Sequence, residues 1–574
     1  MFMFAERFSR VGSSELKALH NALADLSVST DALRTPLNKK VKSIVGRGHA
    51  LCLLEGDPPF AATAQELSDN EECLRGVLTA LGAVGIIYNR RHGELATLID
   101  KPPIPLDNLF SWIDFIHPIH RRTMPSHSSG HNVVSAVSSL LSALLCCTNA
   151  YMAVFVQESP RVMLLTLDIW LHYPTYLRGA AGGHATAAVS ISRAMLGLFI
   201  QVSDGLSLAV LITELMRLLD GRPQRLLRYI AAQTRSLERL EISPDAPYVW
   251  DEHFAAALLV LTNPNFDGIL VHRRSLQPII ANAQRCLSDF ENPNYRGATE
   301  SATRILCHLM TNTLDYRNTV RAVEAGVFDF MMKLRVRAKD LPSLIRLEGH
   351  IMDSFWLSSV LRAFYRRHKD ILDSPLMDDV VPEYGKAVLP TFALRWNTYR
   401  EVMKESKEWK SLLPCGNRDM TRHGLEVNPC ICGDIFYCSK LCQRDDWNAG
   451  HRGECCRANN VWGLQDVLTL EDSVFLIGRV QTAIACAADT LESRLAALKL
   501  QPGEQPRIHV HMGGSPEGAD EFGCLVCVEP ARYPREDITV QIHLLLGQFT
   551  VRRLMPFVHH LDAFKAEELA ENSA

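Results

Sequence analysis

Cysteine is unevenly distributed along this chain. Of its 16 cysteines, seven fall between residues 415 and 456, and the rest are scattered, mostly through apolar segments where a free cysteine behaves as a small hydrophobic side chain. A disulfide framework would need a secreted chain, and the opening MFMFAERFSR lacks the cationic start and sustained apolar run of a secretory signal. Clustered thiols in a reducing compartment predict a metal site instead. The clustered cysteines are Cys415, Cys430, Cys432, Cys438, Cys442, Cys455 and Cys456.

The spacing within this cluster suits zinc. Zinc prefers four thiolate or imidazole ligands in a tetrahedron, and two ligands a few residues apart can reach one ion from a short turn. His451 and Cys455 stand four residues apart, so one helical face would present both. Cys456 could replace Cys455 as a ligand, but the four-residue spacing favours Cys455. The predicted metal ligands are Cys415, Cys430, Cys432, Cys438, Cys442, His451 and Cys455.

The sequence around these ligands resembles that of the MYND zinc-finger family. The resemblance rests on the block Phe436–Gln443, on Asp446-Trp447, and on Gly450-His451 followed by Cys455. It covers about 42 residues and implies two zinc ions in a cross-braced arrangement, in which the first and third ligand pairs share one ion and the second and fourth pairs share the other. Cys438 and Cys442 match the third pair, and His451 and Cys455 match the fourth.

Two departures from the family pattern concern the remaining pairs. Arg418 stands where the second cysteine of the first pair belongs, so His423 or Asp419 would have to replace it, or the ion is weakly held. The second pair is one residue shorter than the family's, as Cys430-x-Cys432. We therefore expect a complete second site and an impaired first site.

The resemblance also implies a binding surface. In family members the finger carries a shallow groove for short proline-rich peptides, and the matching positions here are Gln443 and Trp447. The alternative is that Trp447 only packs over the zinc-binding turns. Forty residues bury too little apolar surface to fold alone, so metal would supply the missing stability in either case.

Residues 1–400 predict a mainly α region. Apolar residues recur there at helical spacing, and Val320–Phe328 contains a Glu-Ala-Gly turn before an apolar helix, which resembles armadillo repeats. Gly326 would permit the tight turn between the two helices. No clean repeat period runs through the region, so an irregular armadillo-like scaffold is predicted, with a non-repetitive helical bundle as the alternative.

The rest of the chain divides into a zinc finger at 411–458, a small α+β unit at 461–565 and a polar tail at 566–574. In the α+β unit, Ile508, Val510 and Met512 alternate with His509 and His511, the period of a strand. These histidines and Cys524-x-x-Cys527 suggest a third metal site, but a solvent-facing position for the histidines and a strand core for the cysteines is the simpler interpretation. This layout also looks like a large group of uncharacterised fungal MYND proteins.

Bulk properties exclude some functions. The net charge of −4 offers no basic face for nucleic acid. Residues 133–156 carry no charge, but Thr148 and Asn149 interrupt them, which favours two buried helices over a membrane span. We expect an intracellular protein without a membrane segment; the sequence does not separate nucleus from cytoplasm.

The predicted function is that of a non-catalytic interaction protein: a helical scaffold whose finger docks a partner peptide, in transcriptional regulation by one interpretation. The alternative is a protein-modifying enzyme that uses the finger to dock its substrate. A lysine methyltransferase would need a β-rich catalytic domain and an Asn-His-Ser-Cys motif, which are not found, and a ubiquitin ligase fits poorly with the Tyr437-Cys438-Ser439 block. No catalytic residue is predicted.

Overall fold

The structure of this chain is a computed structural model. The described residues are 18–19, 21–22, 39–41, 43, 51–89, 104–120, 129–147, 150–178, 184–203, 205–238, 246–313, 315–372, 388–404, 415–417, 427–430, 435–455, 470–499, 505–512, 524–531, 539–546 and 549–555. They form two compact units, one of residues 1–266 with 281–302 and one of residues 267–280 with 303–574.

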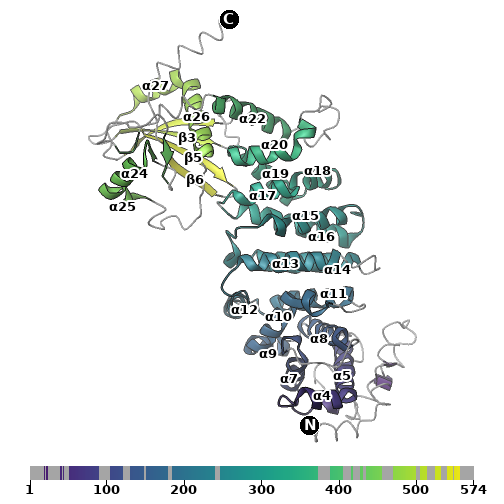
Figure 1. The fold of residues 1–574 in the computed structure, drawn as a ribbon. Helices are drawn as coiled ribbons and strands as arrows, with labels where there is room; N and C mark the ends of the chain where they lie inside the picture. Colours follow the sequence, from purple (N-terminus) through teal and green to yellow (C-terminus); the bar gives the residue numbers. More distant parts are fainter. Residues whose placement is uncertain are drawn as a thin grey trace. The chain divides into compact units, whose positions relative to one another are not determined.

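The first unit is built from helices. Within it, α5 packs against α8, α8 against α11, and α11 against α14 (Figure 1). Helices about three apart in the sequence therefore form one row of neighbours. Helix α10 packs against α11, α12 and α13. The helices are α4 (Ala64–Asp69), α5 (Glu71–Asn89), α7 (Leu106–Ile116), α8 (Ser129–Leu145), α9 (Ala150–Glu158), α10 (Pro160–Tyr176), α11 (His184–Gln201), α12 (Gly205–Leu218), α13 (Gln224–Glu238) and α14 (Ala246–Leu261).

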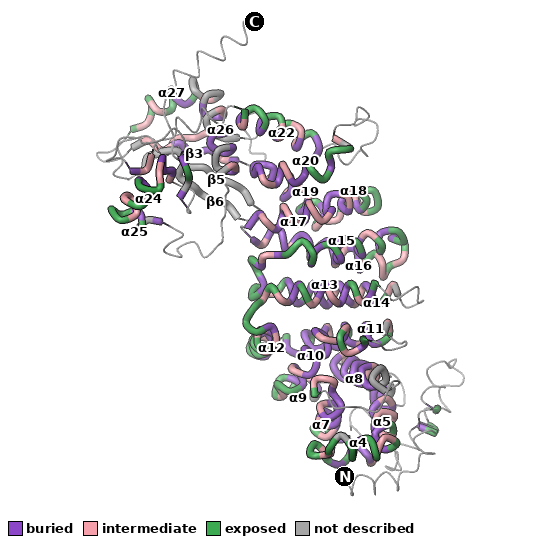
Figure 2. Tube along the Cα trace, in the orientation of Figure 1, coloured by how far each residue is buried: buried purple, intermediate pink, exposed green. Residues whose placement is uncertain are grey.

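The uncharged segment 133–156 is divided between two helices, α8 and α9, as predicted, but the prediction that both are buried is wrong for α9, where Met152 and Val156 are buried and Val154 is exposed. Most of α8 is buried (Figure 2). At Gly197 of α11, a Cβ atom would lie 2.8 Å from the backbone carbon of Leu145, so the two helices approach closely through a glycine. Within the described residues, no helix combines the length and apolarity that a bilayer crossing needs.

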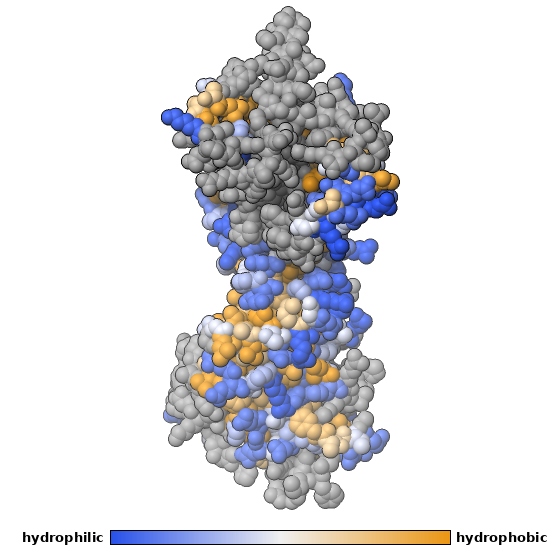
Figure 3. All heavy atoms as spheres, turned by 90° about the vertical axis from the view of Figure 1, so that its left-hand side faces the viewer, coloured by the Kyte–Doolittle hydropathy of each residue, from blue (hydrophilic) through white to orange (hydrophobic). Residues whose placement is uncertain are grey.

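Some apolar side chains of this unit face solvent. Leu206 and Val210 on α12 are 79% and 36% exposed, and Val154 on α9 is 49% exposed. Figure 3, which views the side on which α9 and α12 lie, shows hydrophobic surface between hydrophilic residues there. This surface lies outside the core.

The second unit continues the helical pattern. The predicted turn is present: α17 (Arg317–Ala325) ends at Gly326, whose φ of +97° is readily adopted only by glycine, and α18 (Val327–Arg337) follows at once. Further helices are α19 (Pro342–Ser354), α20 (Ser358–Leu372) and α22 (Val388–Lys404). Helices α15 (Arg273–Leu287) and α16 (Pro293–Thr311) contribute residues to both units.

The mainly α prediction is therefore confirmed, together with a small C-terminal sheet. Helices α26 (Leu470–Cys486) and α27 (Ala488–Ala497) precede β3 (Gln505–Met512), β4 (Cys524–Ala531), β5 (Thr539–Leu546) and β6 (Phe549–Met555). The strand order is β4-β3-β5-β6; β3 and β5 are parallel and the other neighbours are antiparallel. The armadillo-like character of the helical region stays a prediction.

Helix α26 packs against α20 and α22. At Gly478, a Cβ atom would lie 2.5 Å from Val402 Cγ1, so α26 approaches α22 through this glycine. Because α22 and α26 lie on either side of the cysteine cluster in the sequence, the cluster is an insertion between two helices that contact each other.

The strand β3 has one face in the core and one lined by histidine. Ile508, Val510 and Met512 are buried, as the alternation predicts. The expectation that His509 faces solvent is wrong: it is 8% exposed, and its Nδ1 lies 2.8 Å from His543 Nε2 on β5. Parallel pairing of β3 with β5, which local alternation could not reveal, brings the two imidazoles together.

Candidate metal centre

Two very short strands lie within the cysteine-rich segment. Strand β1 (Asn428–Pro429) pairs antiparallel with β2 (Phe436–Tyr437), and the Cys430 N–H donates to the Ile435 carbonyl at 2.7 Å. This pairing places Cys430 directly after β1 and Cys438 directly after β2.

A third piece of chain joins this hairpin through Gly416. Its N–H donates to the Phe436 carbonyl at 2.7 Å, and a Cβ atom at this position would lie only 2.2 Å from Ile435 Cγ2. Glycine therefore allows the chain to approach the hairpin, and its neighbour Cys415 is carried to the end of β2. A larger residue at 416 would collide with the Ile435 and Tyr437 side chains.

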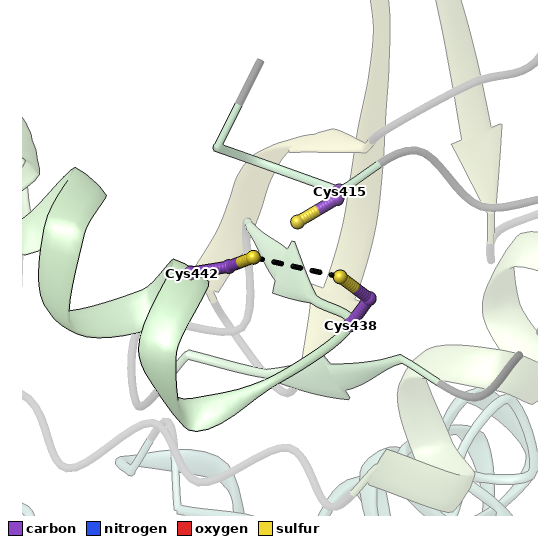
Figure 4. A group of neighbouring side chains, drawn as sticks. All are labelled: Cys415, Cys438 and Cys442. Carbon is purple, nitrogen blue, oxygen red and sulfur yellow. Dashed lines mark hydrogen bonds between the residues drawn. The ribbon is translucent and has the colours of Figure 1, made fainter. Parts of the chain in front are cut away.

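Helix α24 (Lys440–Asp446) presents the next ligand. Its N-cap is Ser439, whose hydroxyl accepts from the Cys442 N–H at 3.1 Å. This cap places Cys438 just before the helix and Cys442 in its first turn. Figure 4 shows the thiols of Cys415, Cys438 and Cys442 directed toward one another.

Two members of the second set, His451 and Cys455, lie beyond α24. A π-helical turn, Trp447–His451, and the short helix α25 (Arg452–Glu454) lead to Cys455, whose N–H donates to the His451 carbonyl at 2.6 Å. The ring of His451 lies against Cys430, with Nε2 3.2 Å from Sγ. Within the described residues, two sets of three ligand atoms lie within 4.8 Å of one another: Cys415, Cys438 and Cys442, and Cys430, His451 and Cys455.

The distances fit zinc. With Zn–S near 2.3 Å and Zn–N near 2.0 Å, tetrahedral geometry separates two thiolates by about 3.8 Å and a thiolate from an imidazole nitrogen by about 3.5 Å. The Cys438 and Cys442 sulfurs are 3.6 Å apart, far beyond the length of a disulfide bond, so neither cysteine is disulfide-bonded to the other. Soft thiolate and imidazole donors in this arrangement suit zinc rather than calcium or magnesium.

The electrostatics of the first set explain why it needs a metal. Burial raises the pKa of the Cys415 thiol, and the neighbouring Cys438 thiol adds to the effect. Three adjacent thiolates would repel one another, whereas a divalent cation among them favours their deprotonated form.

The structure brings together six of the seven predicted ligands. Cys432 lies outside the described residues, as do the suggested substitutes His423 and Asp419 and the alternative ligand Cys456. The two sets alternate along the chain, which is the cross-braced order. The third metal site suggested for the C-terminal unit is not among the ligand sets found in the described residues.

Several residues that position the ligands carry no metal-binding chemistry. The N-cap Ser439 could have been inferred from a serine at the start of a short helix. The Tyr437 hydroxyl, which donates to Asp446 Oδ2 at 2.6 Å, had no local signal because the strand and the helix end meet only after folding.

The two residues expected to bind peptide are both half-buried. Gln443 lies on α24 and Trp447 starts the turn that follows. The Trp447 ring packs edge-on against the His451 ring, with centroids 5.8 Å apart. Trp447 therefore supports a metal ligand and still exposes part of its indole.

These features define a class of protein, one with a small zinc-binding finger whose two ligand sets interleave. A family model described as MYND finger matches residues 414–455. Residues 414–455 are therefore a MYND-type zinc finger, which is a zinc-binding module, and the two Cys/His clusters within it are consistent with two zinc sites. No curated protein and no solved structure matched the chain.

Proposed function

We propose that this protein is a non-catalytic interaction protein whose finger docks a peptide of a partner protein, with the helical units as scaffold. The observation that carries the proposal is the position of Trp447. Its ring rests on the zinc ligand His451, which fixes it, while the half-buried indole remains accessible. Rigid aromatic side chains with a polar group are frequent anchors in peptide binding.

The chemistry of this surface favours a proline-rich peptide. Gln443 and Trp447 are four residues apart, so they lie on the same side of the helical segment. An aromatic ring accommodates proline, and an amide side chain can donate to the exposed carbonyls of an extended peptide. The extended peptide needs little ordering on binding because its conformation is already preferred when free.

We also propose that the protein works in a reducing intracellular compartment. Zinc sites built on thiolates need those thiols reduced, which is the usual state in cytosol and nucleus. The process that the docking serves, transcriptional regulation included, follows from the identity of the partner.

The test is binding of fluorescent proline-rich peptides to the full-length protein. Trp447→Ala should weaken binding by roughly 30-fold, the effect of losing one aromatic anchor, at unchanged zinc content. Asn448→Ala, which alters an exposed neighbour on the same turn, is the matched control and should bind normally. Equal binding by the Trp447 variant and the intact protein would refute the proposal.

A second assay addresses the enzyme alternative. Full-length protein incubated with S-adenosylmethionine, or with ubiquitin and its activating and conjugating enzymes, should modify no protein bound through the finger. Reproducible transfer of a methyl group or ubiquitin would replace the non-catalytic proposal.

A further inference from the structure

The two ligand sets differ in the further zinc ligands that the neighbouring sequence offers. Zinc in a structural site takes four protein ligands. Cys430 has Cys432 two residues away in the sequence, and this spacing predicts Cys432, which lies outside the described residues, as the fourth ligand beside His451 and Cys455. Around Cys415, the segment 411–419 reads SLLPCGNRD and contains no second cysteine, so the Cys415 set has three thiolates and its fourth ligand, whether Asp419, His423 or water, is not a thiolate.

The sets also differ in exposure. Cys430, His451 and Cys455 are 3%, 5% and 1% exposed, so the second ion is enclosed. In the first set Cys438 and Cys442 are buried but Cys415 is only half-buried. A chelator can therefore approach the first ion more readily than the second.

We infer that the ion held by Cys415, Cys438 and Cys442 keeps one exchangeable, non-thiolate ligand, and that its occupancy controls the docking surface of the finger. The second ion is the permanent one. The control of docking rests on the proposed function. The difference in how tightly the two ions are bound does not depend on it.

The link to docking is helix α24. Cys438 precedes the N-cap Ser439, and Cys442 lies in the first turn, so the first ion holds the N-terminal end of the helix. The other end is held by the Tyr437–Asp446 hydrogen bond and, beyond it, by His451. A helix of seven residues is unstable by itself.

Loss of the first ion should therefore loosen the start of α24 and displace Gln443 relative to Trp447. Because Trp447 packs on His451 of the second set, its ring stays in place. Peptide binding then requires both ions, whereas the finger keeps part of its fold with one. By linkage, bound peptide also strengthens the hold on the first ion.

Zinc release from the full-length, zinc-loaded protein tests the unequal hold. With a chromogenic chelator in excess, one equivalent should leave quickly and one slowly. Cys415→Ser should abolish the fast phase and keep the slow one. Release of both equivalents at one rate, or loss of the slow phase in Cys415→Ser, would overturn the inference.

A gain-of-ligand variant makes the test sharper. Arg418→Cys supplies a thiol three residues after Cys415, the spacing of a zinc-binding pair, and should slow the fast phase about 10-fold or more. Arg418→Ala removes the same arginine without adding a ligand, and should release zinc like the intact protein. If Arg418→Ala slows release as much as Arg418→Cys, the fourth ligand is not the cause and the inference fails.

Peptide affinity at one and at two zinc equivalents tests the control of docking. Protein stripped of the fast equivalent should bind a proline-rich peptide at least about 10-fold more weakly. Equal affinity in the two states contradicts control by the first ion. Absence of peptide binding in both states instead counts against the proposed function and leaves the release experiment to decide the unequal hold.

Discussion

The Tyr316 hydroxyl donates a hydrogen bond to Asp472 at 2.9 Å, although 156 residues separate them in the sequence. Asp472 is fully buried and also accepts from the Ser358 hydroxyl at 2.7 Å and from the Ser359 N–H at 3.0 Å. Its neighbour Glu471 pairs with Arg362 at 2.6 Å. The start of α26 is thus bound to helices that precede the finger in the sequence, so α22 and α26, which flank the finger in the sequence, belong to one helical framework.

Replacing Asp472 should be strongly destabilising. Asp472→Ala leaves several buried donors without their acceptor, and hydrogen bonds to a charged group contribute about 1.5–3 kcal/mol each without full additivity. We expect the free energy of unfolding to fall by roughly 3 kcal/mol, measured by urea unfolding of the full chain. Asp340→Ala, at an exposed position, is the control and should change it little. A near-neutral Asp472→Ala would show that these bonds contribute no net stability.

Gly478 should not tolerate alanine, even though alanine is the better helix former. A Cβ atom there would lie 2.5 Å from Val402 Cγ1, and overpacking of this kind costs about 1–3 kcal/mol. Because the obstacle is a side chain, Val402→Ala should relieve it. In a double-mutant cycle by thermal unfolding, the Gly478→Ala penalty should be smaller in the Val402→Ala background, and equal penalties would contradict the contact.

Two other helical glycines should behave differently. At Gly197 the obstacle is the backbone of Leu145, which cannot be trimmed, so Gly197→Ala should lower the melting temperature with no rescue by side-chain changes. Gly349 in α19 has open space around its Cβ position, and Gly349→Ala should stabilise by up to about 1 kcal/mol. A destabilising Gly349→Ala would contradict the open space at the Cβ position of residue 349.

Acid should destabilise the helical units through buried histidines. Burial lowers the pKa of His253 to about 3 and of His350 to about 4, and it lowers the pKa of His117 to about 4. The unfolded chain binds a proton near pH 6.5 while the folded chain does not, so stability is complete above about pH 6.5 and falls as pH drops toward 4. Each histidine contributes a loss on the order of 3 kcal/mol over this window.

Single replacements measure this dependence. His253 and His350 each lie beside a threonine hydroxyl, Thr234 at 3.0 Å and Thr319 at 2.8 Å. His253→Gln and His350→Gln should each be less stable at pH 7 but lose less stability between pH 7 and 4.5. Urea unfolding at the two pH values gives the comparison. An unchanged difference between the two pH values would mean that the histidine does not titrate in this range.

Removing zinc should unfold the finger and spare the helices. Metal analysis of purified protein should give two equivalents of zinc, and a strong chelator should remove both. In the described part of the finger the helical segments are short, namely α24, the turn Trp447–His451 and α25, so far-ultraviolet circular dichroism should change little while Trp447 becomes more accessible to a quencher. Cys442→Ser combined with His451→Ala should have the same effect. A finger that stays ordered without metal would contradict the assignment.

Local spacing was enough to predict several elements. Ligands one to four residues apart reach one ion from a single turn, so Cys438 with Cys442 and His451 with Cys455 predicted zinc without any knowledge of the fold. The turn at Gly326 and the buried alternation of Ile508, Val510 and Met512 were predictable for the same reason, because each depends on the geometry of one short segment.

Long-range partners were decided only by the tertiary structure. That Cys415 joins Cys438, and Cys430 joins His451, was implied by the family resemblance but by no spacing, since the hairpin and Gly416 create those neighbours. The burial of His509 depends on its pairing with β5, and the partners of Asp472 depend on the packing of α26 against α20. A sequence pattern reports which side of a helix or strand a residue occupies, whereas the residue that it meets there depends on how distant segments pack.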